Sequence, residues 1–280
     1  MKQHLHLLIL LLFALPVEAQ PTLESLLRAV DAAIEDSEQY EKDKMQRITL
    51  IKDGLKVSGL SLEEEYRINL RLYTEYEAYI CDSARHYINR NIELAVRLNN
   101  REWLNESKLK KVHILATSGL YAEGLRLLET INKQHLSDRL LVDYYMAFEN
   151  IYLYYAEYAQ DDEYMPGYLD KMNSYRDSVL MIVPEGSYQY VIVQGPMLIY
   201  HQQPKEAENL LKTYISGVSS DTREYAILTS ILAFTYQNDS QLELQKMCLA
   251  ESAIADIKAV VKENNSLRAL AELLYPKIRR

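Results

Sequence analysis

The sequence predicts an all-α protein built as a solenoid of antiparallel helix pairs, an α-α superhelix. The 280-residue chain has only 8 Gly and 7 Pro against 48% hydrophobic residues, which favours long helices with short connections over many strands and turns. Apolar residues recur at helical spacing along nearly the whole chain. A helix-turn-helix unit, clearest in residues 108–132, is repeated several times, and such a unit buries its apolar face only when copies stack beside it.

Short breaks divide the helical periods into consecutive pairs, so we expect residues 20–280 to form one helical repeat domain. The last predicted helix has no partner helix in the sequence. An unpaired helix either caps the stack or indicates that the chain is a fragment of a longer protein. The expected helices are 23–34 with 39–56, 62–78 with 83–98, 102–118 with 121–132, 138–159 with 164–183, 187–201 with 204–217, 225–236 with 242–262, and finally 266–275.

Capping and breaking residues set several of these boundaries. Ser61 and Glu64 form a capping box, in which the hydroxyl and the carboxylate accept hydrogen bonds from free amides at the start of a helix. Asp221 and Glu224 predict the same device before residue 225. Pro184 ends one helix, and Pro204 opens another because a first turn does not use the missing N–H.

The unit over residues 102–132 resembles the tetratricopeptide repeat. In that pattern Gly124 occupies the point where two helices approach closely, and a larger side chain there would push them apart. The resemblance implies a stack of helix pairs in which each repeat contacts its neighbours only. The matching positions are Val112 and Leu115 in the first helix, Gly119 at the turn, and Tyr121, Gly124 and Leu128 in the second helix.

The first nineteen residues read as a secretory signal peptide. Lys2 supplies a positive start, residues 5–14 are almost wholly apolar, and residues 17–19 offer a cleavage site near Ala19. The apolar run is about ten residues, shorter than the roughly 20 that cross a bilayer. We therefore expect an exported, periplasmic protein, with an uncleaved anchor as the lesser alternative.

Charge and motif content argue against two classes of function. The formal net charge of −9 disfavours nucleic-acid binding, which depends on clusters of Lys and Arg. The chain shows no local pattern of a zinc protease, a serine hydrolase, a phosphate-binding glycine loop or a Cys-x-x-Cys pair. We therefore expect no enzyme, no cofactor and no metal site.

Two cysteines, Cys81 and Cys248, lie in distant repeats. A disulfide requires Cα atoms within about 7 Å, so we do not expect these two to pair. Buried thiols are the favoured state, and a single exposed, redox-active thiol is the alternative.

Tyrosine is unusually abundant, with 23 Tyr against 3 Phe. A Tyr ring fills a thin core while its hydroxyl reaches water, so packing is the first interpretation. The second is that surplus rings line a concave recognition surface, because aromatic residues are favoured binding anchors. The candidate binding residues of such a surface are Tyr145, Glu149, Tyr152, His113 and Gln194.

Several stretches also resemble a family of uncharacterised bacterial envelope regulators. Such proteins combine a signal peptide, exported repeats, one membrane span and a cytoplasmic regulator-like region. The resemblance implies that this chain corresponds to the exported N-terminal half and that any membrane contact comes through a C-terminal region not present here. The stretches are residues 23–27, 40–42, 73–76, 82–84, 253–257 and 262–267.

Together these observations favour a non-enzymatic periplasmic repeat module that binds a protein or peptide, or the ligand-sensing half of a membrane-bound transcriptional regulator. The alternative is a periplasmic binding protein for a small molecule, a glycan or a peptide. An enzyme on a helical scaffold comes third.

Overall fold

The computed structural model describes residues 21–159 and 161–276, and the predicted signal peptide lies outside them. In this described part every regular element is a helix, as the sequence predicts. The α-helices are α1 (Leu23–Glu35), α2 (Ser37–Asp53), α3 (Leu62–Tyr76), α4 (Cys81–Arg97), α5 (Arg101–Thr117), α6 (Tyr121–Glu129), α7 (Asp138–Ala159), α8 (Met165–Leu180), α9 (Tyr188–Tyr200), α10 (Pro204–Ile215), α11 (Arg223–Asn238), α12 (Leu242–Lys258) and α13 (Asn265–Leu274); short 3-10 turns follow α2 (Gly54–Lys56) and α6 (Lys133–His135).

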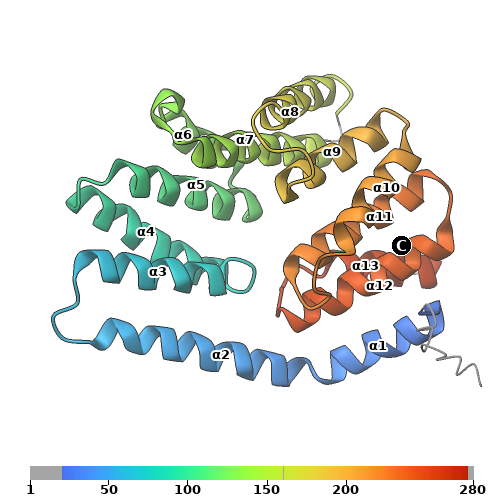
Figure 1. Cartoon of the computed structure of the whole chain (residues 1–280), viewed down its shortest axis with the longest axis horizontal. Helices are drawn as coiled ribbons and strands as arrows, with labels where there is room; N and C mark the ends of the chain where they lie inside the picture. The colour runs from blue at the N-terminus through green and yellow to red at the C-terminus, as the bar shows by residue number, and fades with distance from the viewer. Residues whose placement is uncertain (1–20, 160, 277–280) are drawn as a thin grey trace, which may run out of the picture.

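Consecutive helices pack as pairs from α3 with α4 through α11 with α12, and each pair also contacts the next pair along the chain. Figure 1 shows these pairs stacked along a curved path. Gly124 lies at a close approach, as predicted: a Cβ added there would lie 3.0 Å from the Ile151 Cδ1 atom of α7. The stack is therefore the helix-pair solenoid that the repeats predict.

The capping predictions have mixed outcomes. Ser61 and Glu64 form the predicted capping box at the start of α3. The predicted pair of Asp221 and Glu224 is wrong, because Thr222 is the N-cap of α11 and its hydroxyl accepts the backbone N–H of Tyr225 at 3.2 Å. Thr222 is itself a favoured N-cap residue one position closer to the helix, so it competes successfully with Asp221.

The two ends of the stack meet, which the sequence-based expectation of neighbour-only contacts did not include. Helix α1 packs against α12, and Leu26 and Val30 of α1 are buried in the core formed by α9 to α13. Helix α2 also contacts α12. Figure 1 shows α1 and α2 running along one edge, from α12 to α3. The solenoid is thus closed into a ring, and we call the contact of α1, α2 and α3 with residues 256–264 the seam.

Hydrogen bonds reinforce the seam at the end of α12. The Lys44 ammonium donates to the Ala259 carbonyl oxygen at 3.0 Å, and the Lys262 backbone N–H donates to the Ala78 carbonyl oxygen at 2.9 Å. The Glu41 carboxylate accepts a 2.5 Å hydrogen bond from the Tyr79 hydroxyl and lies 3.5 Å from the Lys262 ammonium. Because the free carbonyls at a helix end need donors, Lys44 of α2 acts as a cap for α12 across the ring.

Helix α13 packs against α12, and Leu270 is buried in the same core as α1.

The two cysteines are separate free thiols in the structure, Cys248 buried and Cys81 partly buried. Burial raises the pKa of the Cys248 thiol to about 12, so this thiol is protonated at neutral pH.

Candidate functional site

A cavity of about 410 Å³ lies between the first helices of four consecutive pairs, α3, α5, α7 and α9. We call it the lumen cavity. Its size falls in the range of about 300–1,000 Å³ that is usual for ligand sites, and its wall mixes apolar, polar and charged side chains. The lining residues are Tyr73, Glu77, Leu109, Lys110, Val112, His113, Ala116, Asp143, Met146, Ala147, Asn150, Tyr188 and Gln189.

Tyr73 and Lys110 fix the wall between α3 and α5. The Tyr73 ring is buried, and its hydroxyl donates to the Lys110 carbonyl oxygen at 3.2 Å. The Lys110 ammonium lies 5.1 Å from the centre of the same ring, within the range of a cation–π contact. These two contacts hold the polar wall of the cavity at a fixed helix spacing.

His113 lies on the α5 side of the cavity. Burial lowers the pKa of its imidazole, and the nearby Arg223 charge lowers it further while Glu77 opposes both. The side chain is therefore neutral near pH 7 and offers a ligand one N–H donor and one acceptor nitrogen.

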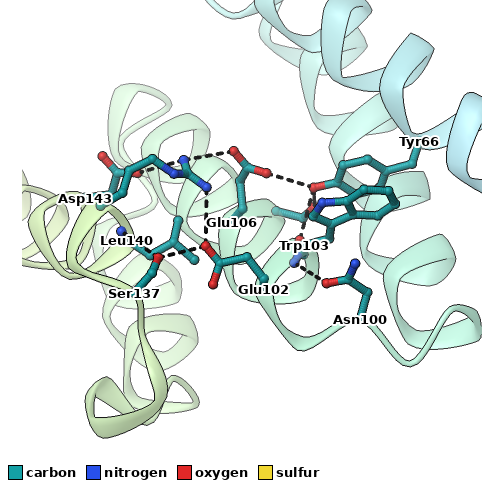
Figure 2. Close-up of polar contacts among 10 residues, drawn as sticks. Tyr66, Asn100, Glu102, Trp103, Glu106, Ser137, Leu140 and Asp143 are labelled. Carbon is teal, nitrogen blue, oxygen red and sulfur yellow. Dashed lines mark hydrogen bonds and ion pairs between the residues drawn. The ribbon is translucent and has the colours of Figure 1, made fainter.

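Asp143 carries a polar network from the outer ends of α5 and α7 into the cavity. The Arg139 guanidinium lies 3.1 Å from the Glu106 carboxylate and 3.8 Å from that of Asp143. Figure 2 shows Glu106 also accepting a hydrogen bond from Tyr66, at 3.2 Å. Burial raises the pKa of the Asp143 carboxyl although Arg139 opposes the shift. The side chain is nevertheless 47% exposed to solvent.

Arg223, the first residue of α11, has a buried guanidinium nitrogen, Nη1, with no hydrogen-bond partner in the described part of the chain. Its positive charge lowers the pKa of side chains on five different helices, so the guanidinium lies within electrostatic range of all five, although Arg223 is not among the residues that line the lumen cavity. Those side chains are Lys44 of α2, Tyr73 of α3, His113 of α5, Tyr188 of α9 and Asp256 of α12.

Asp256 of α12 is an acidic group within electrostatic range of Arg223. Burial raises the pKa of its carboxyl to about 6, Arg223 opposes the shift, and Glu263 adds to it. Glu263 also acts on His113 and on Tyr154 of α7. Arg223 therefore has acidic groups within electrostatic range, and its Nη1 nitrogen is a hydrogen-bond donor without an acceptor among the described residues.

Comparison with known families identifies the fold. The family described as the SusR N-terminal TPR domain matches residues 34–278 of this chain. The chain belongs to that family. The match begins near the end of α1 and extends beyond α13, so it includes every helix pair around the lumen cavity.

A solved structure agrees with this assignment. The TPR domain is similar to the crystal structure of a thermophilic TPR protein of Thermus thermophilus, with a TM-score of 0.52 and 20% identity over 76% of this chain and 99% of that chain. At this identity the likeness concerns the fold alone. No curated protein matches the chain.

The described residues hold neither a membrane-spanning helix nor a metal-binding cluster. No helix there combines the length and the apolar character needed to cross a membrane. No group of three or more His, Cys, Asp or Glu side chains in the same residues is placed to hold a metal ion. The wall of the lumen cavity combines apolar side chains with hydrogen-bonding and charged ones.

The structure brings one of the sequence-predicted site residues to the lumen cavity, namely His113. Tyr145, Glu149 and Tyr152 instead contact α8: Glu149 is buried and accepts a 2.8 Å hydrogen bond from Arg176, and both Tyr rings pack against Tyr175. Gln194 is partly buried in α9 and does not line the cavity.

Most tyrosines of the TPR domain serve packing. Five of them are buried, and those of α6, α7 and α8 form a continuous series of ring contacts that begins at Tyr121 and runs through Tyr155, Tyr168 and Tyr152 to Tyr175. Lys171 lies 5.1 Å from the centre of the Tyr152 ring, at the outer side of this series. The ring contacts therefore stabilise the packing of α7 against α8.

Sequence reasoning missed Arg223 and Glu77. Both stand at helix ends, Arg223 as the first residue of α11 and Glu77 as the C-cap of α3. A charged residue at a helix end is ordinarily a solvated group, so no local signal distinguishes these two. In the structure Glu77 lines the lumen cavity, and Arg223 lies within electrostatic range of Tyr73 and His113 in the lining.

Proposed function

We propose that this TPR domain is a non-enzymatic module that binds a protein or peptide, and that a segment of the partner enters the lumen cavity. TPR domains generally mediate protein–protein interactions, and this fold is typically non-enzymatic. Side chains of four helix pairs surround the cavity, so one bound segment would contact several repeats at once.

The observation that carries this proposal is the unpaired Nη1 nitrogen of Arg223, a residue outside the lining of the lumen cavity but within electrostatic range of Tyr73 and His113 in that lining. A buried donor without a partner costs about 1–3 kcal/mol, and more when the group is charged. A ligand that supplies a carbonyl or carboxylate oxygen recovers this free energy on binding, and guanidinium is well suited to such acceptors. We therefore expect a ligand that offers at least one oxygen acceptor to Arg223.

The test compares two arginine variants on one peptide array. The purified wild-type chain is screened against random 12-residue peptides, and the affinity of the strongest binder is then measured in solution. Arg223→Met should weaken that affinity by about tenfold or more, because a hydrogen bond to a charged group contributes about 1.5–3 kcal/mol. Arg28→Met is the matched control, because the Arg28 side chain is 72% exposed on α1. Retained affinity in Arg223→Met, or an array without binders, would contradict the proposal.

A second candidate is a binding protein for a small molecule, such as a glycan or a short peptide. The volume of the lumen cavity, about 410 Å³, favours it, because this volume matches a compact ligand. Oligosaccharides and di- to tetrapeptides should then raise the melting temperature in a concentration-dependent way. The rise should disappear in Arg223→Met. Stabilisation by none of these compounds would exclude this candidate.

We also propose that the domain acts in the periplasm as the ligand-sensing half of a membrane-bound transcriptional regulator. Residues 1–19 have the composition of a signal peptide, and the matching family is described as an N-terminal domain. The exported protein should begin near Gln20 when its N-terminus is sequenced, and the reading frame should continue past Arg280 into a membrane span. A full-length cytoplasmic protein, or a stop codon after Arg280, would contradict this.

A further inference from the structure

Helix α1 is attached to the rest of the ring as an arm. It packs mainly against α12 and only slightly against the following helix, α2. One apolar face makes this contact, with Leu26, Val30 and Ala33 buried. Thr22 and Ser25 form a capping box at the start of α1, so the helix begins on its own residues. The arm is therefore a self-contained helix whose position depends on the core of the C-terminal repeats.

A one-residue kink at Asp36 separates α1 from α2. The backbone of Asp36 has a φ of −83° and a ψ of −2°, in the bridge region, and it departs from a regular helix mainly in ψ, by about 40°. Residues 30–42 contain neither Pro nor Gly, the residues that commonly cause a helix kink. The local sequence does not require the kink, and we attribute it to the packing of α1 against α12.

The kink is weakly held. The Asp36 side chain does not cap the first amides of α2, and in a continuous helix those amides would bond to carbonyls of α1. A cavity of about 270 Å³ lies beside the kink, lined there by Ile34 and Ser37. Farther along α2, Lys44 and Ile48 join this helix to the seam without help from α1. Helix α1 can therefore leave its place while α2 stays in the ring.

We propose that α1 is an exchangeable arm and that its partner is a second copy of this chain. In the exchanged state, residues 23–53 form one straight helix, and α1 of each copy occupies the place on α12 of the other copy. A second copy fits this place because its α1 presents the same apolar residues to the same core. Two identical exchanges also close the assembly with two-fold symmetry. Each ring is then completed by a helix of its partner.

Exchange recovers the contacts of α1 and adds the hydrogen bonds of the straightened kink. It is opposed by the loss of freedom when two chains associate, and by the high effective concentration of a helix tethered beside its own place. The conformational preference of residues 36 and 37 therefore sets the balance between the single ring and the dimer. Exchange involves no ligand in the lumen cavity, so its test is separate from that of the proposed function.

The first test changes the kink and measures dimerisation by analytical ultracentrifugation. Asp36→Ala combined with Ser37→Ala replaces two poor helix formers by the best one. Because each dimer contains two straightened kinks, the association constant should rise by about tenfold or more over wild type. Asp43→Ala, at an exposed position within α2, is the matched control and should leave the constant unchanged. Asp36→Gly should lower it, because glycine weakens a continuous helix. An unchanged constant in the double variant would overturn the proposal.

The second test distinguishes exchange of α1 from ordinary contact between two surfaces. In a Cys81→Ser background, a fluorescent donor is attached at Asp31→Cys on α1 and an acceptor at Glu243→Cys on α12, both exposed sites, while the buried Cys248 stays unlabelled. A single ring with both labels gives the reference donor lifetime. Dimers of the double kink variant that carry donor and acceptor on different chains should show the same lifetime, because α1 of one chain then lies on α12 of the other. A different lifetime in these dimers would overturn the proposal.

Discussion

Two helix ends in this ring have the same hydrogen bonds and different residues at the critical position. At the end of α5, Leu120 N–H donates to the Leu115 carbonyl at 2.8 Å and Gly119, with a φ of 77°, occupies the left-handed position. At the end of α12, Val261 N–H donates to the Asp256 carbonyl at 2.9 Å and Val260 occupies that position. Both are the Schellman turn that commonly ends a helix.

The difference shows what each turn does for the ring. A Cβ at Gly119 would meet no atom within 4 Å, so this position needs only the backbone freedom of glycine. Val260 is buried in the core of α2 and α3, so its side chain is needed where its backbone is disfavoured. A turn between neighbouring repeats follows local preference, whereas the turn at the seam follows packing between residues far apart in the sequence.

The largest expected effect comes from emptying the seam core itself. Ile48→Ala removes a fully buried side chain that shares a core with Val260, and should lower the free energy of unfolding by about 2–5 kcal/mol. Chemical denaturation measures this loss. Leu50→Ala is the control on the same helix, because Leu50 is 73% exposed, and it should change stability by less than about 0.5 kcal/mol. Equal stability of both variants would show that the seam does not contribute.

Placing valine at position 119, in the turn after α5, tests the cost of the left-handed backbone conformation alone. Gly119→Val places a β-branched residue in the left-handed region with nothing to pack against, and should destabilise the fold by about 1–2 kcal/mol. Gly119→Asn should cost less, because Asn tolerates this conformation. The melting temperatures of the two variants, Gly119→Val and Gly119→Asn, measure this difference. Equal melting temperatures would refute the strain argument.

Replacing Val260 at the seam with glycine removes the backbone strain but also removes the buried side chain. Val260→Gly relieves about 1–2 kcal/mol of strain but exposes a core that gains about 1.5–3 kcal/mol from a Val side chain. A net loss of about 1 kcal/mol in unfolding free energy is therefore expected by denaturant titration. Stabilisation instead would mean that Val260 contributes nothing across the seam.

Asp256 should also make the stability depend on pH. Because burial raises the pKa of its carboxyl to about 6 from an ordinary 3.8, the folded state holds this proton more tightly than the unfolded state does. The stability contributed is full below pH 3.8 and is lost as the pH rises through about 6. Arg223 and Glu263 are the charged groups facing it. The difference in unfolding free energy between wild type and Asp256→Asn should fall over this range, and a flat difference would contradict it.

Local patterns predicted the fold well because helix pairing is a local property. Helical periodicity gave the pairs, Ser61 and Glu64 gave one boundary, and Gly124 gave a close approach. Of the predicted binding residues only His113 lies at the lumen cavity, because spacing identifies one face of a helix but not the helix that covers it. Tyr145, Glu149 and Tyr152 do share a face, and α8 covers it.

Closure of the ring could not be predicted in the same way. It depends on the total curvature of all the pairs, which no single repeat encodes, and it brings together Lys44 and Ala259, 215 positions apart. Arg223 becomes a candidate ligand group only after that closure, since its neighbours come from helices throughout the chain.

The capping of α12 by Lys44 has a consequence for how the molecule comes apart. An open stack of repeats frays from its termini, because each outermost repeat has a single neighbour. Here the first and the last repeats are each other's neighbour, so neither is outermost. Opening must begin by separating two ends that are both already packed, and the loss of either end removes support from the other.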